Sequence, residues 1–437
     1  MRPGSFTTGP GQNGEATPLS PSRPHRRLNR VENTAKQVTS GWKRLSSLLV
    51  QGGRPEPTPQ EGSFVNAPVT RGSTVLFPSL DAMKEQGLRS HEHELIYGAM
   101  GSPIQHELEK LIALIEGGTH TQVVSSGLAA CTLPLLAFLN AGDHLLLPDS
   151  VYGPTRRFAG TMLARMGIET SYYAPLADEE ALRGLLRDNT RVIFAESPGS
   201  HTFEVQDIPM LARVAHEHGA LLMLDNTWGI GIFQPFRHGV DVSIQALTKY
   251  PAGHSDVIAG AITVADGALW KDLRDSAIQI GQLAGPDECW LTLRGLRTMA
   301  VRLERQSASA LLVAQWLRGR PEVAKVLHPA FEECPGHEFW ARDFEGASSL
   351  FGVELRADLS VAAMRDMIDA LALFGIGASW GGYESLVLPT TGGVRRSLPN
   401  AMPEGPSFRL HIGLEDPNDL IADLEGGMEV LRASVAG

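Results

Sequence analysis

The chain has 437 residues, of which 43% are hydrophobic and 20% charged, and its formal net charge is -11 at pH 7. This apolar fraction excludes disorder throughout the chain, and the length exceeds the roughly 250 to 300 residues at which a single core stops growing. The negative charge argues against nucleic acid or an anionic membrane as the main partner, because both attract a basic surface. Small-molecule ligands are favoured.

The first 38 residues differ in composition from the rest of the chain. Residues 1–38 are rich in Gly, Pro, Ser and Thr, with more arginine than acidic residues, and bury too little apolar surface to offset the entropy of ordering. We predict a disordered extension, either a transit peptide or a plain extension. No apolar run reaches the ~20 residues of a spanning helix. The three cysteines lack CxxC spacing, so we expect a reducing, cytoplasmic location.

Short apolar runs alternate with helical segments from residue 107 onward. Pro209 suits the first turn and Gly219 the end of a helix over 208–219. The alternation implies a mainly parallel sheet with helices on both faces, and the strand-like runs thin out after about residue 297. One predicted strand ends at 123–127, and three more occupy 144–148, 192–197 and 220–225. A buried helix is predicted over 127–139.

Polar residues at three strand ends form the candidate site, because ligands of open parallel sheets bind outside the carboxyl ends of the strands. Ser126 and Gly127 lie between a strand and a helix start, where backbone N–H groups favour a phosphate. Asp225 closes an apolar run, and Lys249 precedes a glycine turn, where a desolvated lysine becomes a carbonyl-reactive amine. Simpler interpretations stay open: a turn glycine, a helix N-cap and a solvated lysine.

Together these residues offer a phosphate cradle, an acid that can protonate a heteroaromatic nitrogen, and an amine that can bond to an aldehyde. Pyridoxal 5'-phosphate (PLP) needs these three groups from a protein. Other motifs fail: Gly229 and Gly231 lack the third glycine of a dinucleotide fingerprint, and Ala246 removes a Ser-x-x-Lys motif. The histidine clusters at 91–94 and 216–218 lack His-Glu-x-x-His spacing and are predicted to be solvated surface, with no metal.

From about residue 45 to its end, the sequence resembles the Cys/Met-metabolism family of PLP enzymes. Within this family it is most similar to the bacterial cystathionine β-lyases, and eight segments carry the resemblance. The segments are Glu-Ser-Pro-Gly-Ser (196–200), Leu-Asp-Asn-Thr-Trp (224–228), Asp-Val-Ser-Ile-Gln-Ala-Leu-Thr-Lys-Tyr (241–250), Gly-His-Ser-Asp (253–256), Arg-Gly-Leu-Arg-Thr (294–298), Gly-His-Glu-Phe-Trp (336–340), Ser-Trp-Gly-Gly-Tyr-Glu-Ser-Leu (379–386) and Arg-Leu-His-Ile-Gly-Leu-Glu-Asp (409–416).

The resemblance implies an α/β fold of the fold type I PLP-dependent transferase class. Its mainly parallel seven-stranded sheet would have helices on both faces, beside a smaller C-terminal α/β domain. The implied division is an arm over 39–106 that contacts the neighbouring subunit, a PLP-binding domain over 107–296 and a C-terminal domain over 297–437. A homotetramer built from dimers with shared sites is also implied.

Roles for ten residues follow from the resemblance, position by position. Lys249 would bond covalently to the cofactor and later move protons, Asp225 would keep the pyridine nitrogen protonated, and Arg409 would bind the substrate α-carboxylate as a planar fork. The other implied roles are phosphate binding by the backbone of Gly127 and Leu128, ring stacking by Tyr152, a hydroxyl beside the lysine from Thr248, pocket shape from Ser379 and Trp380, and a contact across the subunit boundary from Tyr97.

One position departs from the family pattern Tyr-x-Arg-x-Gly, which here reads Tyr97 to Gly101 with Ala99 in place of the arginine. Losing that contact to the phosphate should weaken cofactor binding by roughly 1.5 to 3 kcal/mol unless another cation replaces it. The β-lyase-like Trp380 and Ala246 favour β-elimination of cystathionine to homocysteine, pyruvate and ammonia. The alternatives are a cysteine desulfhydrase, a γ-lyase, or a PLP-binding scaffold without turnover.

Overall fold

The structure is a computed structural model that describes residues 41–55, 62–398 and 402–436, so the predicted disorder of 1–38 lies outside it. Within these ranges no helix is both long and apolar enough to cross a bilayer. The helices are α2 (Gly41–Gln51), α3 (Leu80–Gly87), η1 (Gly98–Met100), α4 (Pro103–Glu116), α5 (Gly127–Phe138), α6 (Gly153–Phe158), η2 (Ala159–Leu163), α7 (Glu179–Arg183), α8 (Ile208–His218), η3 (Pro235–His238), α9 (Gly267–Gln279), α10 (Pro286–Arg318), α11 (His337–Asp343), α12 (Val361–Asp369) and α13 (Pro417–Ala436).

A seven-stranded sheet is the larger of two sheets, and it is mainly parallel as predicted. One strand, β7, runs antiparallel to both of its neighbours, and the other pairs are parallel. In spatial order the strands are β1 (His120–Val124), β7 (Gly260–Val264), β6 (Val242–Gln245), β5 (Leu221–Asp225), β4 (Thr190–Glu196), β2 (His144–Pro148) and β3 (Glu169–Tyr173).

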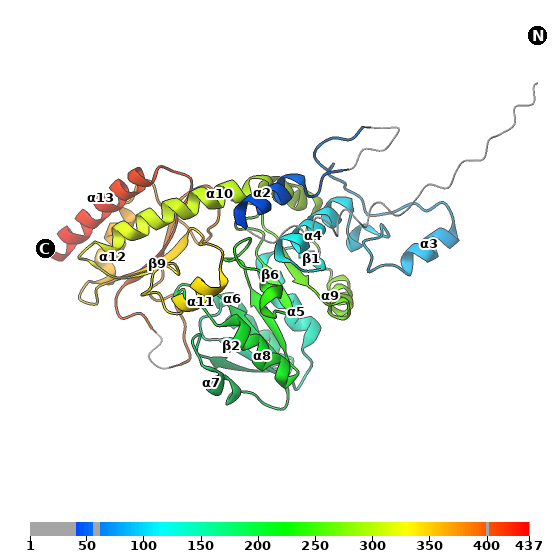
Figure 1. Cartoon of the computed structure of the whole chain (residues 1–437), viewed down its shortest axis with the longest axis horizontal. Coiled ribbons are helices and arrows are strands. Elements are labelled where there is room, and N and C mark those ends of the chain that lie inside the picture. Colours follow the sequence, from blue (N-terminus) through cyan, green and yellow to red (C-terminus); the bar gives the residue numbers. More distant parts are fainter. Residues whose placement is uncertain (1–40, 56–61, 399–401, 437) are drawn as a thin grey trace, which may run out of the picture. The chain divides into compact units, whose positions relative to one another are not determined.

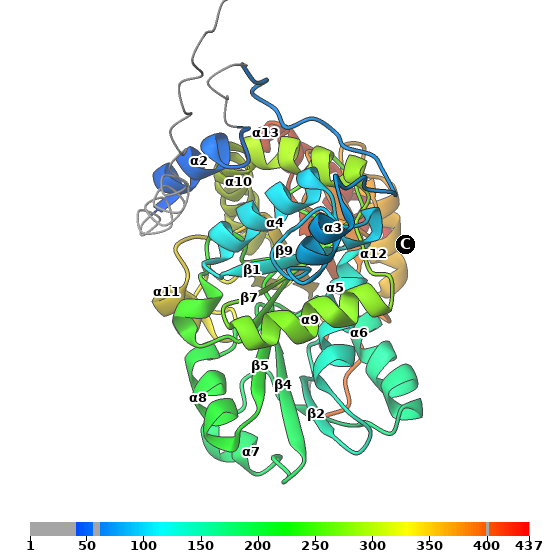
Figure 2. The ribbon, with the colours of Figure 1, turned by 90° about the vertical axis from the view of Figure 1, so that its right-hand side faces the viewer.

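Helices cover both faces of this sheet because successive side chains of its strands enter opposite cores. Leu145 and Leu147 of β2 pack in the core that includes α5 and α9, whereas Leu146 packs in the core that includes α8. Figure 2 shows α8 on one side of β4 and β5, with α5 and α9 on the other. A strand buried on both faces reads as a continuous apolar run, which is why the sequence predicted it.

The predicted elements of this region are confirmed to within a few residues. The apolar segment at 127–139 forms α5, and the segment at 208–219 forms α8, which begins with Pro209 in its first turn. Gly219 ends α8 in the left-handed region, with φ at +73°, a conformation that glycine adopts at little cost.

A five-stranded sheet forms the C-terminal part of the fold. Its core packs α10, α12 and α13 against β9 and β12, and Figure 1 shows α10 running from beside α2 to α13. The predicted boundary at 296–297 falls inside α10, so the division into domains stays a prediction. In spatial order the strands are β10 (Gly375–Ile376), β11 (Leu386–Pro389), β12 (Ser407–His411), β9 (Leu350–Leu355) and β8 (Val323–Leu327).

The two sheets meet where the parallel strands of the first one end. The connection between β10 and β11 contains Gly381, and a Cβ built on this glycine would lie 2.9 Å from the backbone of Lys249, in the turn after β6. Residues about 130 positions apart in sequence therefore share one edge of the larger sheet.

Candidate active site

The carboxyl ends of three neighbouring strands hold the candidate residues. The last residues of β4 and β5, Glu196 and Asp225, pair in register, and β6 is the next strand. Lys249 lies in the turn after β6, and Gly127 opens α5 shortly after β1. The structure thus places the three predicted strand-end signals at one edge of the sheet.

Asp225 has a fixed and partly buried carboxylate. Its Oδ1 accepts hydrogen bonds from Thr227 N at 3.0 Å and Thr227 Oγ1 at 2.6 Å, and Cys131 Sγ lies 3.6 Å from Oδ2. Burial raises the pKa of Asp225, and the bonds from Thr227 and Cys131 and the charge of Lys249 oppose that shift. An acid held in this way stabilises a cation or a protonated nitrogen placed against it.

Lys249 has an amine whose pKa is lowered by its surroundings. Its Nζ donates to Ser379 Oγ at 2.9 Å and lies 5.2 Å from the ring centre of Trp380. Burial and the charge of Arg409 lower the pKa of Lys249 to about 8, against the opposing charge of Asp225. An amine with this pKa is partly unprotonated near neutral pH, as a nucleophile or base requires.

The start of α5 offers backbone donors beside the lysine turn. Ser126 caps the helix, its Oγ accepting from Ala129 N at 3.1 Å, and the first N–H groups of a helix have no partner within it. A Cβ on Gly127 would lie 2.6 Å from the Cβ of Ala246, so this close approach requires glycine. Leu128, the next residue, is 40% exposed. The helix start can therefore hold an anion such as a phosphate.

Arg409 points from β12 toward the segment 378–382. Its Nη2 donates to Ala378 O at 2.6 Å and to Ser379 O at 3.3 Å. The side chain is buried, and burial lowers the pKa of Arg409 to about 10. A guanidinium oriented in this way by backbone carbonyls is pre-organised to bind a carboxylate.

Tyr152 and Glu196 lie together, and sequence reasoning gave a role only to the first. Tyr152 N donates to Glu196 Oε2 at 2.6 Å, and the tyrosine is 41% exposed. Burial and the neighbouring charge of Asp225 raise the pKa of Glu196 well above its ordinary value. Glu196 ends an apolar run as Asp225 does, so the signal that identified Asp225 was present here too.

The remaining predicted residues differ in how they relate to the strand ends. Thr248 Oγ1 donates to Ala259 O and accepts from Ala259 N, both at 3.1 Å, so it fixes the turn that carries Lys249. Tyr97 is 51% exposed and bridges to Thr74 on the arm. Among the contacts of the described residues, none joins Tyr97 to the strand-end site.

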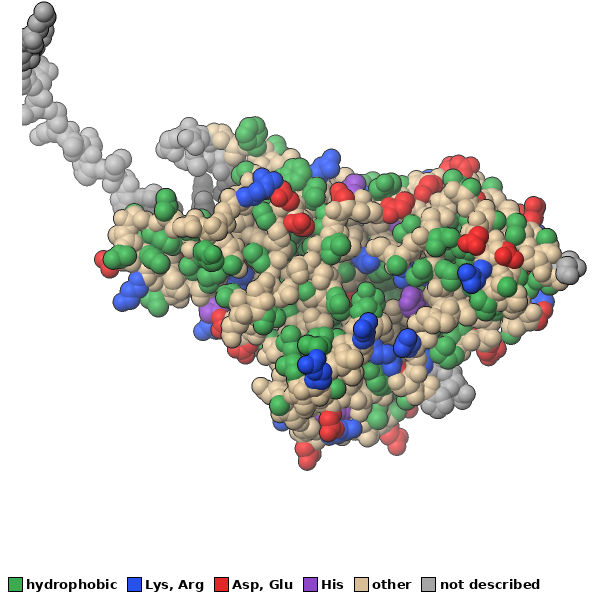
Figure 3. All heavy atoms as spheres, turned by 180° about the vertical axis from the view of Figure 1, so that it is seen from behind, with side chains coloured by type: hydrophobic (Ala, Val, Ile, Leu, Met, Phe, Trp, Pro, Cys, Tyr) green, Lys and Arg blue, Asp and Glu red, His purple; other side chains and the backbone are tan. Residues whose placement is uncertain are grey.

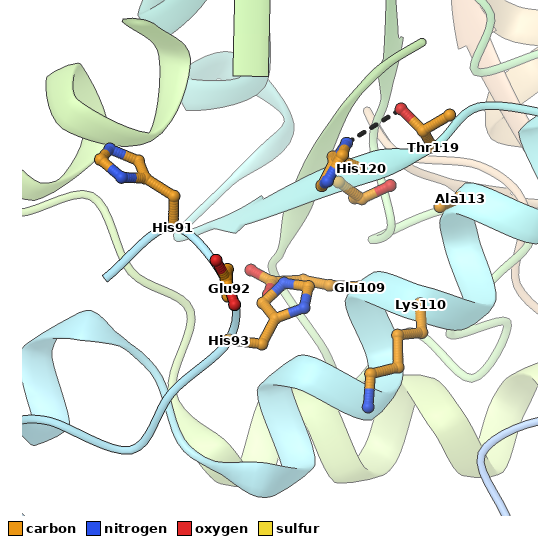
Figure 4. A pocket seen from close by; sticks show the side chains of 9 residues that line it. His91, Glu92, His93, Glu109, Lys110, Ala113, Thr119 and His120 are labelled. Atoms are coloured by element: carbon orange, nitrogen blue, oxygen red, sulfur yellow. Dashed lines mark hydrogen bonds and ion pairs between the residues drawn. The ribbon is translucent and has the colours of Figure 1, made fainter. Parts of the chain in front are cut away.

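The prediction that residues 91–94 are solvated surface is wrong for His93. The side chain of His93 is 17% exposed and lies 2.9 Å from Glu109, a buried carboxylate of α4 that needs a partner. These residues line a cavity of about 280 Å³, and Figure 4 shows His93 beside Glu109 with His91 pointing away. In the described part of the chain no group of three or more His, Cys, Asp or Glu side chains is placed to hold a metal ion. His216 is half exposed, as expected.

A model of the Cys/Met metabolism PLP-dependent enzyme family matches residues 46–429. The chain belongs to this family. The cystathionine beta-lyase of Bordetella avium is 43% identical over 89% of this chain and 98% of its own length. The L-alanine/L-glutamate racemase of Wolbachia pipientis wMel is 39% identical over 87% and 96%. The crystal structure of metB from Corynebacterium glutamicum matches with a TM-score of 0.81 at 30% identity, covering 90% of this chain and 99% of that one. The chain is thus a fold type I PLP-dependent enzyme of Cys/Met metabolism.

The residues at the strand ends fit PLP. Asp225 Oδ2 has only a weak thiol donor at 3.6 Å, which leaves it suited to a protonated ring nitrogen. The start of α5 offers backbone N–H groups without a partner in the helix, which can bind a phosphate, and the Lys249 amine lies at the same edge of the sheet. The departure at Ala99, in η1, removes one cation that the family pattern would add.

Proposed function

We propose that this chain is a carbon–sulfur β-lyase that cleaves L-cystathionine to homocysteine, pyruvate and ammonia. The observation that carries the proposal is the bond of 2.9 Å between Lys249 Nζ and Ser379 Oγ, on the segment that Arg409 also holds. This arrangement supports a proton-accepting amine beside a carboxylate-binding guanidinium. The β-lyase-like sequence of 379–382 and the name of the Bordetella avium relative favour β-elimination over other reactions of the family.

PLP, when bound, supplies an electron sink for the negative charge that develops at the substrate Cα. Asp225 would keep the pyridine nitrogen protonated, because its partly buried carboxylate gains a cationic partner by doing so. The N–H groups of Gly127 and Leu128 would hold the phosphate, and Tyr152 would stack on the ring. Thr248 would keep the lysine turn in place through its two bonds to Ala259.

Lys249 would take the proton from the substrate Cα. Its pKa of about 8 leaves part of the amine unprotonated near neutral pH. Lys249, or one of the two candidate tyrosines Tyr152 and Tyr97, would then return a proton to the departing sulfur. Homocysteine leaves as a thiol, and hydrolysis of the remaining three-carbon fragment gives pyruvate and ammonia.

Arg409 would bind the α-carboxylate and so orient the Cα–H bond toward Lys249. The guanidinium is fixed by its bonds to Ala378 O and Ser379 O, so little freedom is lost when a substrate binds. Ser379 and Trp380 would line the same pocket, with the Trp380 ring against the amine.

The test is to supply L-cystathionine to the purified PLP-loaded enzyme and to identify the keto acid. Pyruvate together with homocysteine supports the β-lyase, whereas 2-oxobutyrate with cysteine identifies a γ-lyase. L-cysteine and L-alanine are assayed in parallel: sulfide from cysteine alone indicates a desulfhydrase, and loss of optical activity in alanine a racemase. Bound PLP without turnover of any of them indicates a scaffold.

We also propose that the enzyme is a cytoplasmic homotetramer whose arm, residues 39–106, contacts the neighbouring subunit's site through Tyr97. Support comes from large apolar side chains on the arm: Leu76 is 92%, Leu80 84% and Leu88 78% exposed. Figure 3 shows hydrophobic side chains on the surface around α3. Such exposure is typical of an interface. Light scattering on the active enzyme tests this, and a fully active monomer contradicts it.

A further inference from the structure

A chain of buried hydrogen bonds runs behind Lys249 toward the segment 378–382. Tyr250 is fully buried, and its hydroxyl lies 3.0 Å from Ser349 Oγ and accepts from Ser349 N at 3.1 Å. Ser349 Oγ in turn lies 3.0 Å from His411 Nδ1. The chain therefore joins the lysine turn of the larger sheet to β12 of the smaller one.

The other ring nitrogen of His411 contacts the backbone of the segment. His411 Nε2 lies 3.1 Å from Gly382 O and 3.2 Å from Gly381 N. Gln306 Nε2 also donates to Gly382 O, at 2.6 Å, so a second side chain fixes the same carbonyl.

In either neutral tautomer of His411, each of the two ring nitrogens can make one hydrogen bond. Burial lowers the pKa of His411 to about 3, with the charges of Arg409 and Lys249 acting in the same direction, so the ring carries one proton. With that proton on Nε2, the ring donates to Gly382 O and accepts from Ser349. With the proton on Nδ1, it donates to Ser349 and accepts from Gly381 N–H. The imidazole links Ser349 to the segment in both cases.

The segment itself rests on Lys249. Gly381 has φ at +87°, and a Cβ there would lie 2.9 Å from Cα, C and Cβ of Lys249. The Trp380 ring packs edge-on against the Tyr250 ring at 5.4 Å between centroids. A shift of the segment would therefore break or lengthen the bond from Lys249 Nζ to Ser379 Oγ.

We propose that His411 is a positioning residue, which holds the segment 378–382 against Lys249 and so keeps Ser379 and Trp380 beside the amine. Arg409 and His411 lie two residues apart on β12 and hold the two ends of the segment. The effect on turnover rests on the proposed function, whereas the effect on the lysine rests on these contacts alone.

The test compares two substitutions that each keep one side of the ring. His411→Gln carries an amide near the place of Nε2 and keeps the bond to the segment, whereas His411→Asn carries it near Nδ1 and keeps only the bond to Ser349. The pKa of Lys249 is measured in the full chain stripped of PLP, from the pH dependence of acylation of this lysine followed by mass spectrometry. We expect His411→Asn to move it from about 8 toward the ordinary 10.5, and His411→Gln to leave it in place.

Turnover of the PLP-loaded variants gives the second measurement. A displacement of about 1 Å at a reacting group can cost roughly 100-fold in rate, so kcat/KM should fall by up to that factor in His411→Asn. His411→Gln should retain most of it. The matched control is His328→Asn, because His328 is also a buried histidine of the C-terminal part but contacts Ala330 instead of the segment. It should lose stability and leave the Lys249 pKa unchanged.

The outcomes separate this proposal from the proposed function. A shifted Lys249 pKa in His411→Asn supports the positioning role even if the wild-type chain releases no pyruvate, a result that would overturn only the proposed function. An unshifted pKa in a folded His411→Asn overturns the positioning role. If that variant does not fold, Ser349→Ala replaces it: a smaller shift in the same direction supports the role, and no shift overturns it.

Discussion

The strand-end region and the N-terminal arm hold their candidate residues by different means. Asp225 and Lys249 are fixed by hydrogen bonds and close packing inside one chain. On the arm, Tyr97 is half exposed, and Leu76 and Leu80 of the same arm expose more than four fifths of their surface. The first region can therefore be understood from a single chain, whereas the proposed role of the arm depends on a neighbouring subunit.

Removing the amine of Lys249 should have the largest effect, because the strand-end region depends on it for proton transfer. We expect Lys249→Ala to lower pyruvate release from cystathionine by roughly 1000-fold or more. The control is Lys271→Ala on the exposed side of α9, which should retain wild-type activity. Borohydride reduction of the loaded wild-type enzyme should fix PLP on residue 249. Labelling of another lysine would contradict the assignment.

Glu116 gives the strand ends a pH-dependent stability. Its carboxylate accepts from Gln245 Nε2 at 2.9 Å and from Asn226 Nδ2, and it contacts Ser243 Oγ. Burial raises the pKa of Glu116 from 4.5 to about 7. Because this pKa is raised on folding, the contribution of Glu116 to stability is complete below about pH 4.5 and is lost as the pH rises through 7. The expected loss in unfolding free energy across this window is on the order of 3 kcal/mol.

Thermal unfolding of the full chain at pH 5 and pH 8 measures this loss. Glu116→Gln should flatten the difference between the two pH values, even though the amide makes poorer contacts and lowers stability at pH 5. The matched control is Glu180→Gln on α7, since Glu180 is exposed and should leave the difference unchanged. Equal pH dependence in wild type and Glu116→Gln would show that this carboxylate does not titrate as described.

The arm can be tested by introducing at residue 99 the positive charge that the family pattern has and this chain lacks. We expect Ala99→Arg to tighten PLP binding by roughly 10- to 100-fold, which corresponds to the 1.5 to 3 kcal/mol of a charged hydrogen bond. Fluorescence titration of the PLP-free chain gives the dissociation constant, and Ala99→Gln controls for size without charge. If Arg and Gln bind PLP equally well, residue 99 does not face the phosphate, and the prediction that the arm reaches a neighbouring site loses its support.

The sequence alone was enough to predict a site residue wherever a single local pattern identified that residue. Asp225 and Lys249 each follow an apolar run, and such runs become buried strands whose ends meet at one edge. His411 gave no such signal, because its proposed role depends on Ser349, just before β9, and on Gly382, between β10 and β11. The prediction for His93 was wrong for a similar reason: its partner Glu109 lies on α4, so the burial of the pair cannot be read from residues 91–94.

Substitution of Cys131 should show the smallest effect, because its contact with Asp225 is the weakest of those that hold this carboxylate. Its thiol lies 3.6 Å from Asp225 Oδ2, and a contact of this kind is worth about 0.5 to 1 kcal/mol. We expect Cys131→Ala to weaken PLP binding about two- to fivefold in the same titration. Thr227→Val, which removes the 2.6 Å bond to Oδ1, should weaken it more. A larger loss from Cys131→Ala than from Thr227→Val would mean that Oδ2, and not the Thr227 bonds to Oδ1, fixes the carboxylate.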